Sequence, residues 1–297
     1  MSEDTKDLEK RIQILEKELE EKNSLLLIYK EELQRMNERL GKILRQVDND
    51  LALATSLQSL LVPTEIGDIK GFHFSSKFET GGGQGGDYFE IVQHEDKYKF
   101  AVIMSSSSAY SLSALFMSVL LKLTHQLAKK EGLNPQEFCL KVQEQMQAHM
   151  KNEDAFSLVY AEFDRKKNRV TYSGCGEICA LRWNSKSNEV DTLQLESQKL
   201  QPTQSLELPL NSFRYQVGDR ILFSSPGFVG QKNTKDHVYG SESIVRLLKN
   251  QRFQDVHDLR NELWLDWQKF GQDCDSKKDR SLLVIDVASN LAKLSLT

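Results

Sequence analysis

Apolar residues in the first fifty positions recur in steps of four and three, which average about 3.5 residues. Charged and amide side chains fill most of the positions between them. Such spacing gives a helix one apolar stripe that can pair with a second helix. The stripe comprises Leu8, Ile12, Leu15, Leu19, Leu26, Tyr29, Leu33, Met36, Leu40, Ile43 and Val47. We therefore expect a long helix that dimerises two chains as a parallel coiled coil.

Two residues weaken this helix. Lys22 interrupts the stripe, and Gly41 costs about 1 kcal/mol relative to alanine in a helix. The alternative is a single amphipathic helix folded onto its own domain, but the pattern is longer than the usual globular helix and favours the coiled coil. Because Pro63 disfavours helical geometry at the residue before it, we place a helical arm at residues 1–62 and a domain at 63–297.

Beyond Pro63, short segments of alternating or continuous apolar residues predict strands. They read FHFSSKF, YFEIVQ, YKFAVIM, FSLVYAEFD, RVTYSG, ICALRW, RILFSS and SLLVIDV. Amphipathic helical segments at about 111–150 and 241–270 interrupt them. Since strands and paired helices do not alternate strictly, the pattern indicates an α+β domain with mostly antiparallel sheets.

Composition limits the classes of partner and the cellular location that can be expected. The chain has 297 residues, 39 basic and 43 acidic, so no broad positive field attracts nucleic acid. No apolar run approaches the roughly 20 residues that cross a bilayer, so we expect no membrane insertion. The charged first residues carry no apolar signal core, and the four cysteines form no C-x-x-C pair. These features indicate a cytoplasmic protein with reduced thiols.

Several segments are similar to a known family. Residues 85–90 read GGDYFE and follow a helical segment that ends in QSLLVP. The segments SALFMS, FSLVYAEFDRKKNRVTYSGCG, VGDRILFSS and KDRSLLVIDV come after them in the same order as in the family. From residue 53 to near the C-terminus the chain resembles SpoIIE-like PPM serine phosphatases, relatives of the metal-dependent type 2C protein phosphatases.

The resemblance implies a sandwich of two antiparallel β-sheets flanked by helices, here preceded by the coiled-coil helix. It also implies an active site at one end of the sandwich, where aspartates hold two Mn or Mg ions. Two such ions generate a hydroxide and clamp a phosphate for in-line attack, and they need several carboxylate ligands.

Most of those ligands are replaced in this chain. Aligned on SALFM, Ser105 stands where the family has an aspartate, and Pro226 and Lys278 stand at two further aspartate positions. Only Asp87 is retained. Asp279, one residue from its expected position, and Glu90, which matches an acidic position, are further candidate ligands. The change of about four charge units opposes binding of two dications, and the ammonium of Lys278 could instead pair with Asp87.

The sequence thus predicts a pseudophosphatase that needs no cofactor, binds a protein partner and dimerises through its arm. By analogy with the family, that partner would be a phosphorylatable regulatory protein of a bacterial signalling system. One alternative is an active, divergent Mn- or Mg-dependent phosphoserine protein phosphatase that uses Asp87, Glu90 and Asp279. In a third interpretation the arm is the working part and the domain only caps an oligomer.

Overall fold

The computed structural model describes residues 3–61, 68–81, 86–107, 111–150, 154–249, 255–274 and 278–289. Its contacts divide the chain into a unit at Met1–Leu53 and a second unit at Ala54–Thr297. The boundary expected at residue 62 stays a prediction, although the helix does continue to Leu61 as the sequence indicates.

Helix α1 spans Glu3–Leu61, or 59 residues. The side chains of the apolar stripe are exposed from Ile12 to Val47, and nothing within the unit covers them. Leu8 belongs to the helix, but its side chain lies outside those described. Dimerisation through the stripe therefore stays a prediction. Among the described residues, no helix combines the length and the apolar character needed to span a membrane.

The second unit is built on two antiparallel sheets of five strands each. The first sheet has the order β1-β10-β9-β6-β7, with bounds Phe72–Glu79, Arg280–Val287, Arg220–Ser224, Cys179–Asn184 and Glu189–Thr192. The second has the order β2-β3-β4-β5-β8, with bounds Gly86–Gln93, Lys99–Ser107, Phe156–Asp164, Arg169–Cys175 and Asn211–Arg214. The α+β sandwich expected from the sequence is confirmed.

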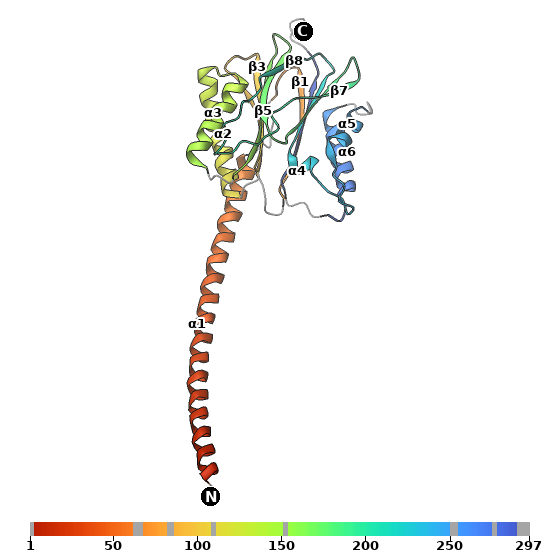
Figure 1. Cartoon of the computed structure of the whole chain (residues 1–297). Coiled ribbons are helices and arrows are strands. Elements are labelled where there is room, and N and C mark those ends of the chain that lie inside the picture. Colours follow the sequence, from red (N-terminus) through yellow and green to blue (C-terminus); the bar gives the residue numbers. More distant parts are fainter. Residues whose placement is uncertain are drawn as a thin grey trace. The chain divides into compact units, whose positions relative to one another are not determined.

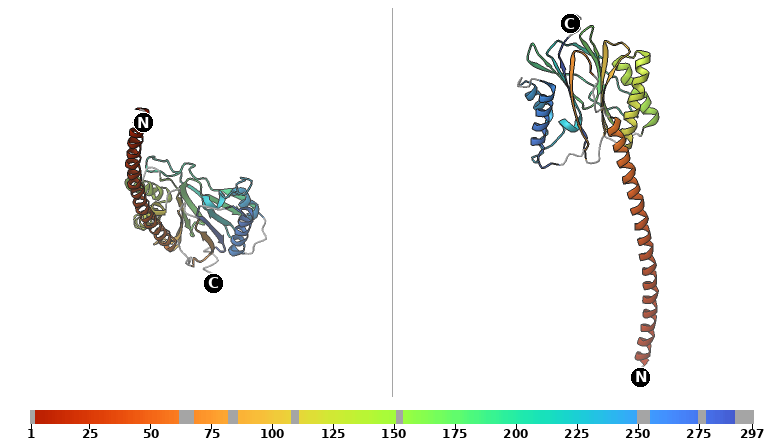
Figure 2. Two further views of the ribbon diagram at one scale, coloured as in Figure 1. Left: turned by 90° about the horizontal axis from the view of Figure 1, so that it is seen from below. Right: turned by 180° about the vertical axis from the view of Figure 1, so that it is seen from behind.

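Helices cover the outer face of each sheet (Figure 1). The second sheet carries α2 (Ser111–Glu131) and α3 (Pro135–His149), and the first carries α4 (Pro226–Val229), α5 (Gly240–Leu248) and α6 (Val256–Phe270). Two further views show the same four-layer order of helices, sheet, sheet and helices (Figure 2).

Strand alternation sets which residues reach the space between the sheets. Phe89 belongs to the central cluster there, with Phe100, Val102, Met104 and Leu283. Tyr88 and Ile103, one position along, instead pack under α2 and α3. The same alternation determines which residue of each strand faces the candidate site described in the next section.

Two of the observed strands were not predicted from the sequence. Both β7 and β8 have only four residues and lie at sheet edges, so neither carries a recognisable apolar alternation. Short turns at residues 164–168 and 184–188 connect β4 to β5 and β6 to β7. Each contains an asparagine with positive φ, Asn168 at 48° and Asn188 at 56°, and asparagine tolerates this conformation better than most residues.

Candidate functional site

Asp87 lies near the start of β2 and is only 1% exposed. Its Oδ1 accepts a 2.6 Å hydrogen bond from the hydroxyl of Ser106. Its Oδ2 accepts a 2.9 Å hydrogen bond from the hydroxyl of Ser281. Both oxygens of the one retained family aspartate are therefore bonded to serine side chains.

The sheet register places these serines. Ser106 stands directly opposite Asp87 in the β2–β3 pair, and residues directly opposite share one face of a sheet. Ser281 is the second residue of β10, which belongs to the other sheet. The hydroxyl–carboxylate bonds thus join the two sheets at one end of the sandwich.

A third serine completes this arrangement. The backbone N–H of Ser225 donates to the carbonyl of Ser281 at 3.0 Å, and the Ser281 N–H donates back to the Ser225 hydroxyl oxygen at 3.0 Å. The Ser225 side chain also hydrogen-bonds to Asp87 and lowers its pKa. We call Ser106, Ser225 and Ser281 the serine ring.

Asp279 holds the neighbouring backbone. Its carboxylate accepts hydrogen bonds from the N–H of Gly81 at 2.8 Å and from the N–H of Asp87 at 3.1 Å. It is 7% exposed. Asp279 therefore pins the chain on both sides of the glycine-rich segment, whose residues 82–85 lie outside those described.

Burial controls the ionisation of both carboxyls. It raises the pKa of Asp87 to about 7, helped by the nearby charge of Asp279 and opposed by the serine ring. Burial also raises the pKa of Asp279, against the hydrogen bonds from Gly81 and Asp87 and the charge of Arg280. Each carboxyl thus holds its proton to a higher pH than an exposed aspartate does.

A small pocket of about 20 Å³ opens beside Asp87. It is lined by Asp87, Ser106, Ser107, Ser157, Glu177, Lys199, Pro226, Lys278 and Asp279. Lys199 forms a 2.8 Å ion pair with Glu177. The pocket brings together four positions that the sequence singled out, namely Asp87, Pro226, Lys278 and Asp279, and its size suits about one water molecule.

Local packing explains why Pro226 and Gly227 occupy one edge of the pocket. Pro226 is the first residue of α4, where the missing N–H costs no helical hydrogen bond. A Cβ on Gly227 would lie 1.9 Å from the carbonyl oxygen of Asp279. The turn thus accepts no side chain at Gly227, and Pro226 contributes no polar side-chain atom to the pocket.

Two predicted positions do not join the site. Ser105 pairs with Tyr88 rather than with Asp87, so it shares the face under α2 and differs by one residue from the serine that faces the carboxylate. Glu90 lies on that same face, where it accepts a hydrogen bond from Tyr88 and lies 3.9 Å from the ammonium of Lys122. Residues 100–104 are all apolar, so the sequence carries no alternation from which this register could be predicted. In the structure Met104 belongs to the core between the sheets and Ile103 to the core under α2 and α3.

The described donors do not fit a two-ion centre. Mg²⁺ and Mn²⁺ need several oxygen ligands in octahedral order. In the part of the chain that the structure describes, no three His, Cys, Asp or Glu side chains come close enough to hold a metal ion. Asp87 and Asp279 already accept hydrogen bonds at both oxygens, and Lys278 lines the same pocket.

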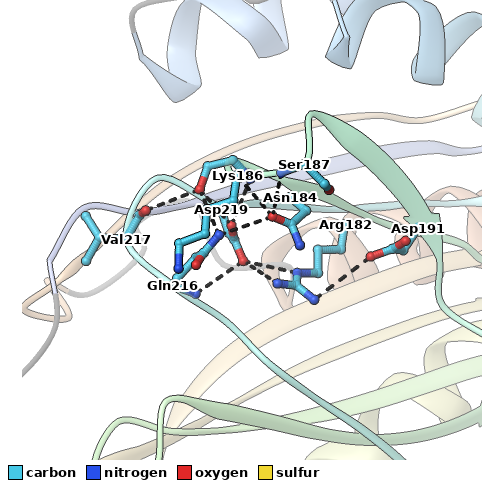
Figure 3. Close-up of polar contacts among 9 residues, drawn as sticks. Arg182, Asn184, Lys186, Ser187, Asp191, Gln216, Val217 and Asp219 are labelled. Carbon is cyan, nitrogen blue, oxygen red and sulfur yellow. Dashed lines mark hydrogen bonds and ion pairs between the residues drawn. The ribbon is translucent and has the colours of Figure 1, made fainter.

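A second buried aspartate stabilises the opposite end of β9. Asp219 is fully buried and accepts hydrogen bonds from Nε and Nη2 of Arg182, at 3.1 and 2.7 Å. It also accepts from the N–H groups of Ser185 and Gln216 (Figure 3). Asp219 thus joins β6, the turn after β6 and the segment before β9 through one carboxylate.

This arrangement is that of a PPM-type phosphatase domain, and comparisons with solved structures agree. The SiaA PP2C domain of Pseudomonas aeruginosa superposes with a TM-score of 0.68 at 12% identity, over 82% of this chain and 97% of that one. The RsbU and RsbW domains of Rv1364c from Mycobacterium tuberculosis give 0.61 at 12%, over 77% and 64%. RsbX in complex with magnesium gives 0.59 at 14%, over 75% and 99%.

Residues 112–288 match the family model of stage II sporulation protein E. The chain therefore belongs to the SpoIIE family. No curated protein matches it. At these low identities the solved structures establish the fold, and what the chain does has to be argued from its own residues.

Proposed function

We propose that this domain does not hydrolyse phosphoserine and instead serves as a binding module for a protein partner in a signalling pathway. The observation that carries the proposal is the serine ring around Asp87, in a pocket that Lys278 also lines. Around this carboxylate the pocket supplies hydroxyls and the ammonium of Lys278, whereas two-ion catalysis needs several anionic ligands.

Charge supports this proposal. An ammonium repels a dication, and neutral hydroxyls give it little of the attraction that carboxylates supply. The serine ring also gives Asp87 hydrogen bonds that partly compensate its burial without any ion. A direct ion pair between Lys278 and Asp87 remains a further part of the proposal, supported by their place in one pocket.

The decisive experiment is hydrolysis of para-nitrophenyl phosphate and of a phosphoserine protein, with and without millimolar Mn²⁺. We expect no turnover above background from the natural chain. Turnover that needs metal and disappears in Asp87→Ala would instead establish the active, divergent phosphatase. The observation in favour of that alternative is that the candidate ligands Asp87 and Asp279 line one pocket.

Two restoring variants sharpen this test. Both carry Pro226→Asp and Lys278→Asp, one with Ser106→Asp and the other with Ser105→Asp. Since Ser106 faces Asp87 and Ser105 lies on the other face, only the Ser106 variant should gain Mn²⁺ binding and turnover. Thermal melts must show that each variant is folded, because a new carboxylate buried without a metal is destabilising.

For the partner we propose a phosphorylatable regulatory protein. The similarity to a protein with RsbU and RsbW domains supports a place among signalling proteins. Binding of purified regulatory proteins from the same organism, in phosphorylated and unphosphorylated form, can be measured by calorimetry. A binding module should keep its affinity for the partner in Asp87→Ala. If the protein also keeps its function after the whole pocket surface is disrupted, the interpretation in which the domain only caps an oligomer is favoured.

The arm, in this proposal, pairs two chains as a parallel coiled coil within the cytoplasm. Its stripe exposes large apolar side chains, among them Leu19 at 62% and Leu26 at 64%. In a parallel pair Arg11 also falls opposite Glu16 of the second chain, at flanking positions that commonly carry ion pairs. Sedimentation of the full chain as a single-chain species at every concentration would contradict this pairing.

A further inference from the structure

Two arginines lie side by side at one edge of the second sheet. Arg169 of β5 stands directly opposite Arg214 of β8, which is the edge strand. At the adjacent position of this ladder the N–H of Tyr215 donates to the carbonyl of Asn168 at 2.9 Å. Hydrogen-bonded pairs alternate with non-bonded pairs in an antiparallel ladder, so the two arginines form a non-bonded pair, whose Cα atoms lie only about 4.5 Å apart. Like charges at such a position destabilise a sheet.

The two guanidinium groups bind little within the domain. Both side chains are exposed, and Arg169 makes one long hydrogen bond, 3.4 Å from its Nε to the hydroxyl oxygen of Thr171. In the described part of the chain, the Arg214 side chain has no hydrogen-bond or ion-pair partner. Asp164 stands opposite Arg169 on β4 but forms its ion pair with Lys167, at 3.8 Å. Both arginines thus keep donors for a ligand.

The next pair along the ladder adds two hydroxyl groups. Thr171 and Ser212 stand opposite each other, and they share the outer face with the arginines because side chains alternate in direction along a strand. Val170, between the two rows, belongs instead to the core between the sheets. Glu162, opposite Thr171 on β4, forms an ion pair with Lys99 at 2.8 Å. We call this block of two guanidiniums and two hydroxyls the edge block: Arg169, Thr171, Ser212 and Arg214.

The chemistry of the edge block suits a phosphoryl group. A guanidinium presents its N–H groups as a planar fork that matches two phosphate oxygens, and hydrogen bonds to an ionised group are about twice as strong as neutral ones. A phosphorylated side chain carries about two negative charges and three acceptor oxygens, so it can bridge both arginines. A carboxylate has one charge and two oxygens. The phosphoryl group therefore offsets more of the repulsion between the arginines.

The backbone of β8 favours an extended peptide as the carrier of that group. Tyr215 hydrogen-bonds to β5, so by alternation Phe213 and Asn211 do so too, and the N–H and C=O groups of Ser212 and Arg214 point away from β5. Among the strands that the structure describes, β5 is the one neighbour of β8. A peptide strand added at this edge lies about 4.8 Å from β8, which places its residue beside Arg214 within reach of both guanidiniums.

We propose that the edge block binds a phosphorylated segment of a partner protein, which adds as an extended strand beside β8 with its phosphoserine or phosphothreonine next to Arg214. The inference rests on the proposed binding function and names the surface and the form of the partner that it recognises. A second copy of this chain is not the occupant, because pairing β8 with itself would bring four arginines together.

The edge block is separate from the Asp87 pocket. Ser106, which faces Asp87, pairs with the start of β4 at Ser157, whereas Arg169 pairs with the end of β4. The two sites therefore lie at opposite ends of the second sheet. Binding at the edge block should accordingly be unchanged in Asp87→Ala.

Fluorescence anisotropy of a labelled peptide with the full chain tests the proposal. The probes are a short peptide of threonine and valine with a central phosphoserine, and the same peptide with serine. We expect the phosphorylated peptide to bind at least about tenfold more tightly, and Arg169→Gln/Arg214→Gln to abolish this preference. The control Arg35→Gln/Arg39→Gln removes the same charge from α1 and should keep it. Equal affinity for the two peptides, or an unchanged preference in the edge-block variant, would overturn the inference.

Ser212 tests the addition of a strand. Its N–H points to the open edge, so Ser212→Pro removes a hydrogen bond to the peptide but none to β5. We expect Ser212→Pro to weaken binding of the phosphopeptide about tenfold, and Ser212→Ala, which lacks only the hydroxyl, to weaken it less. Equal affinities in the two variants, with unchanged circular dichroism, would contradict strand addition. Inorganic phosphate that competes as tightly as the phosphopeptide binds would also overturn the proposal, since the site would then take a free anion.

Failure of the proposed function would be recognised separately. Release of phosphate from the peptide that disappears in Asp87→Ala would show an active phosphatase. The preference for the phosphorylated peptide in Asp87→Ala would still report on the edge block, because that variant cannot hydrolyse the probe and leaves both arginines in place.

Discussion

The hydroxyl of Ser106 donates a 2.6 Å hydrogen bond to the carboxylate of Asp87 across the β2–β3 pair. Asp87 is thereby held in place by uncharged groups of the protein itself, with Ser281 bonded to its other oxygen. Hydrogen bonds to an ionised group stabilise it by more than those between neutral groups. The carboxylate of Asp87 thus links β2, β3 and β10 through hydrogen bonds within the protein.

Removal of the Ser106 hydroxyl should therefore raise the pKa of Asp87 above about 7, because this bond is the largest of those that lower it. In Ser106→Ala we also expect a loss of about 1.5–3 kcal/mol in the free energy of unfolding at pH 8, where the carboxylate is charged. Carboxyl NMR titration and urea unfolding measure the two effects. Ser105→Ala is the control and should leave the pKa of Asp87 unchanged; equal effects from both variants would contradict the register.

Gly227 should be intolerant of any side chain. In Gly227→Ala the new Cβ would lie 1.9 Å from the carbonyl oxygen of Asp279, so the backbone must move. Overpacking of this kind costs about 1–3 kcal/mol, and the displaced segment also holds Asp279 against Gly81 and Asp87. Chemical denaturation measures the loss. Pro226→Ala, which adds no atom at this contact, should cost less than about 1 kcal/mol; a similar loss in both variants would argue against the steric cause.

The sequence predicted the fold well because its strands carry clear alternation and its family segments keep their order. Four of the positions that it singled out, Asp87, Pro226, Lys278 and Asp279, line one pocket in the structure. It missed Ser106 because an alignment on SALFM does not reveal strand register, and a shift of one residue moves a side chain to the other face. It also proposed Glu90 as a candidate ligand, because a match to an acidic family position does not show which face of β2 the residue occupies.

The contact set of Asp219 could not be read from the sequence either. Arg182, Ser185 and Gln216 belong to separate elements, and only the folded sandwich brings their donors to one carboxylate. The segment VGDRILFSS carried Asp219 as a family feature without indicating its partners. Hydrogen-bond partners are a property of tertiary structure, and they distinguish Asp219, which is bonded to Arg182, from the equally buried Asp87, which is bonded to serines.

Loss of the Asp219 carboxylate should destabilise the domain strongly. Asp219→Ala would leave the guanidinium of Arg182 without its closest anion, and breaking a buried pair costs about 3–5 kcal/mol. Asp191 offers a matched control, because it lies 3.9 Å from the same Arg182 but is 54% exposed. Asp191→Ala should cost less than about 1 kcal/mol. Urea unfolding of both variants measures the contrast, and comparable losses would contradict the role assigned to Asp219.

His125 should make the domain sensitive to acid. It lies on α2, is 3% exposed, and its Nδ1 lies 3.4 Å from the hydroxyl oxygen of Tyr160, which is 3.2 Å from Nε2 of His94. Burial, helped by the charges of His94 and Lys129, lowers the pKa of His125 from 6.5 to about 4. The unfolded chain therefore takes up this proton at a higher pH than the folded domain does.

The sign of the effect follows from linkage. Above pH 6.5 His125 is neutral in both states, and its full contribution to stability is present. As the pH falls from 6.5 towards about 4, the unfolded state gains the proton first, and the free energy of unfolding drops by up to about 3 kcal/mol. Urea unfolding across this range should show a flatter profile in His125→Gln than in the natural chain. Parallel profiles would mean that other groups cause the acid sensitivity.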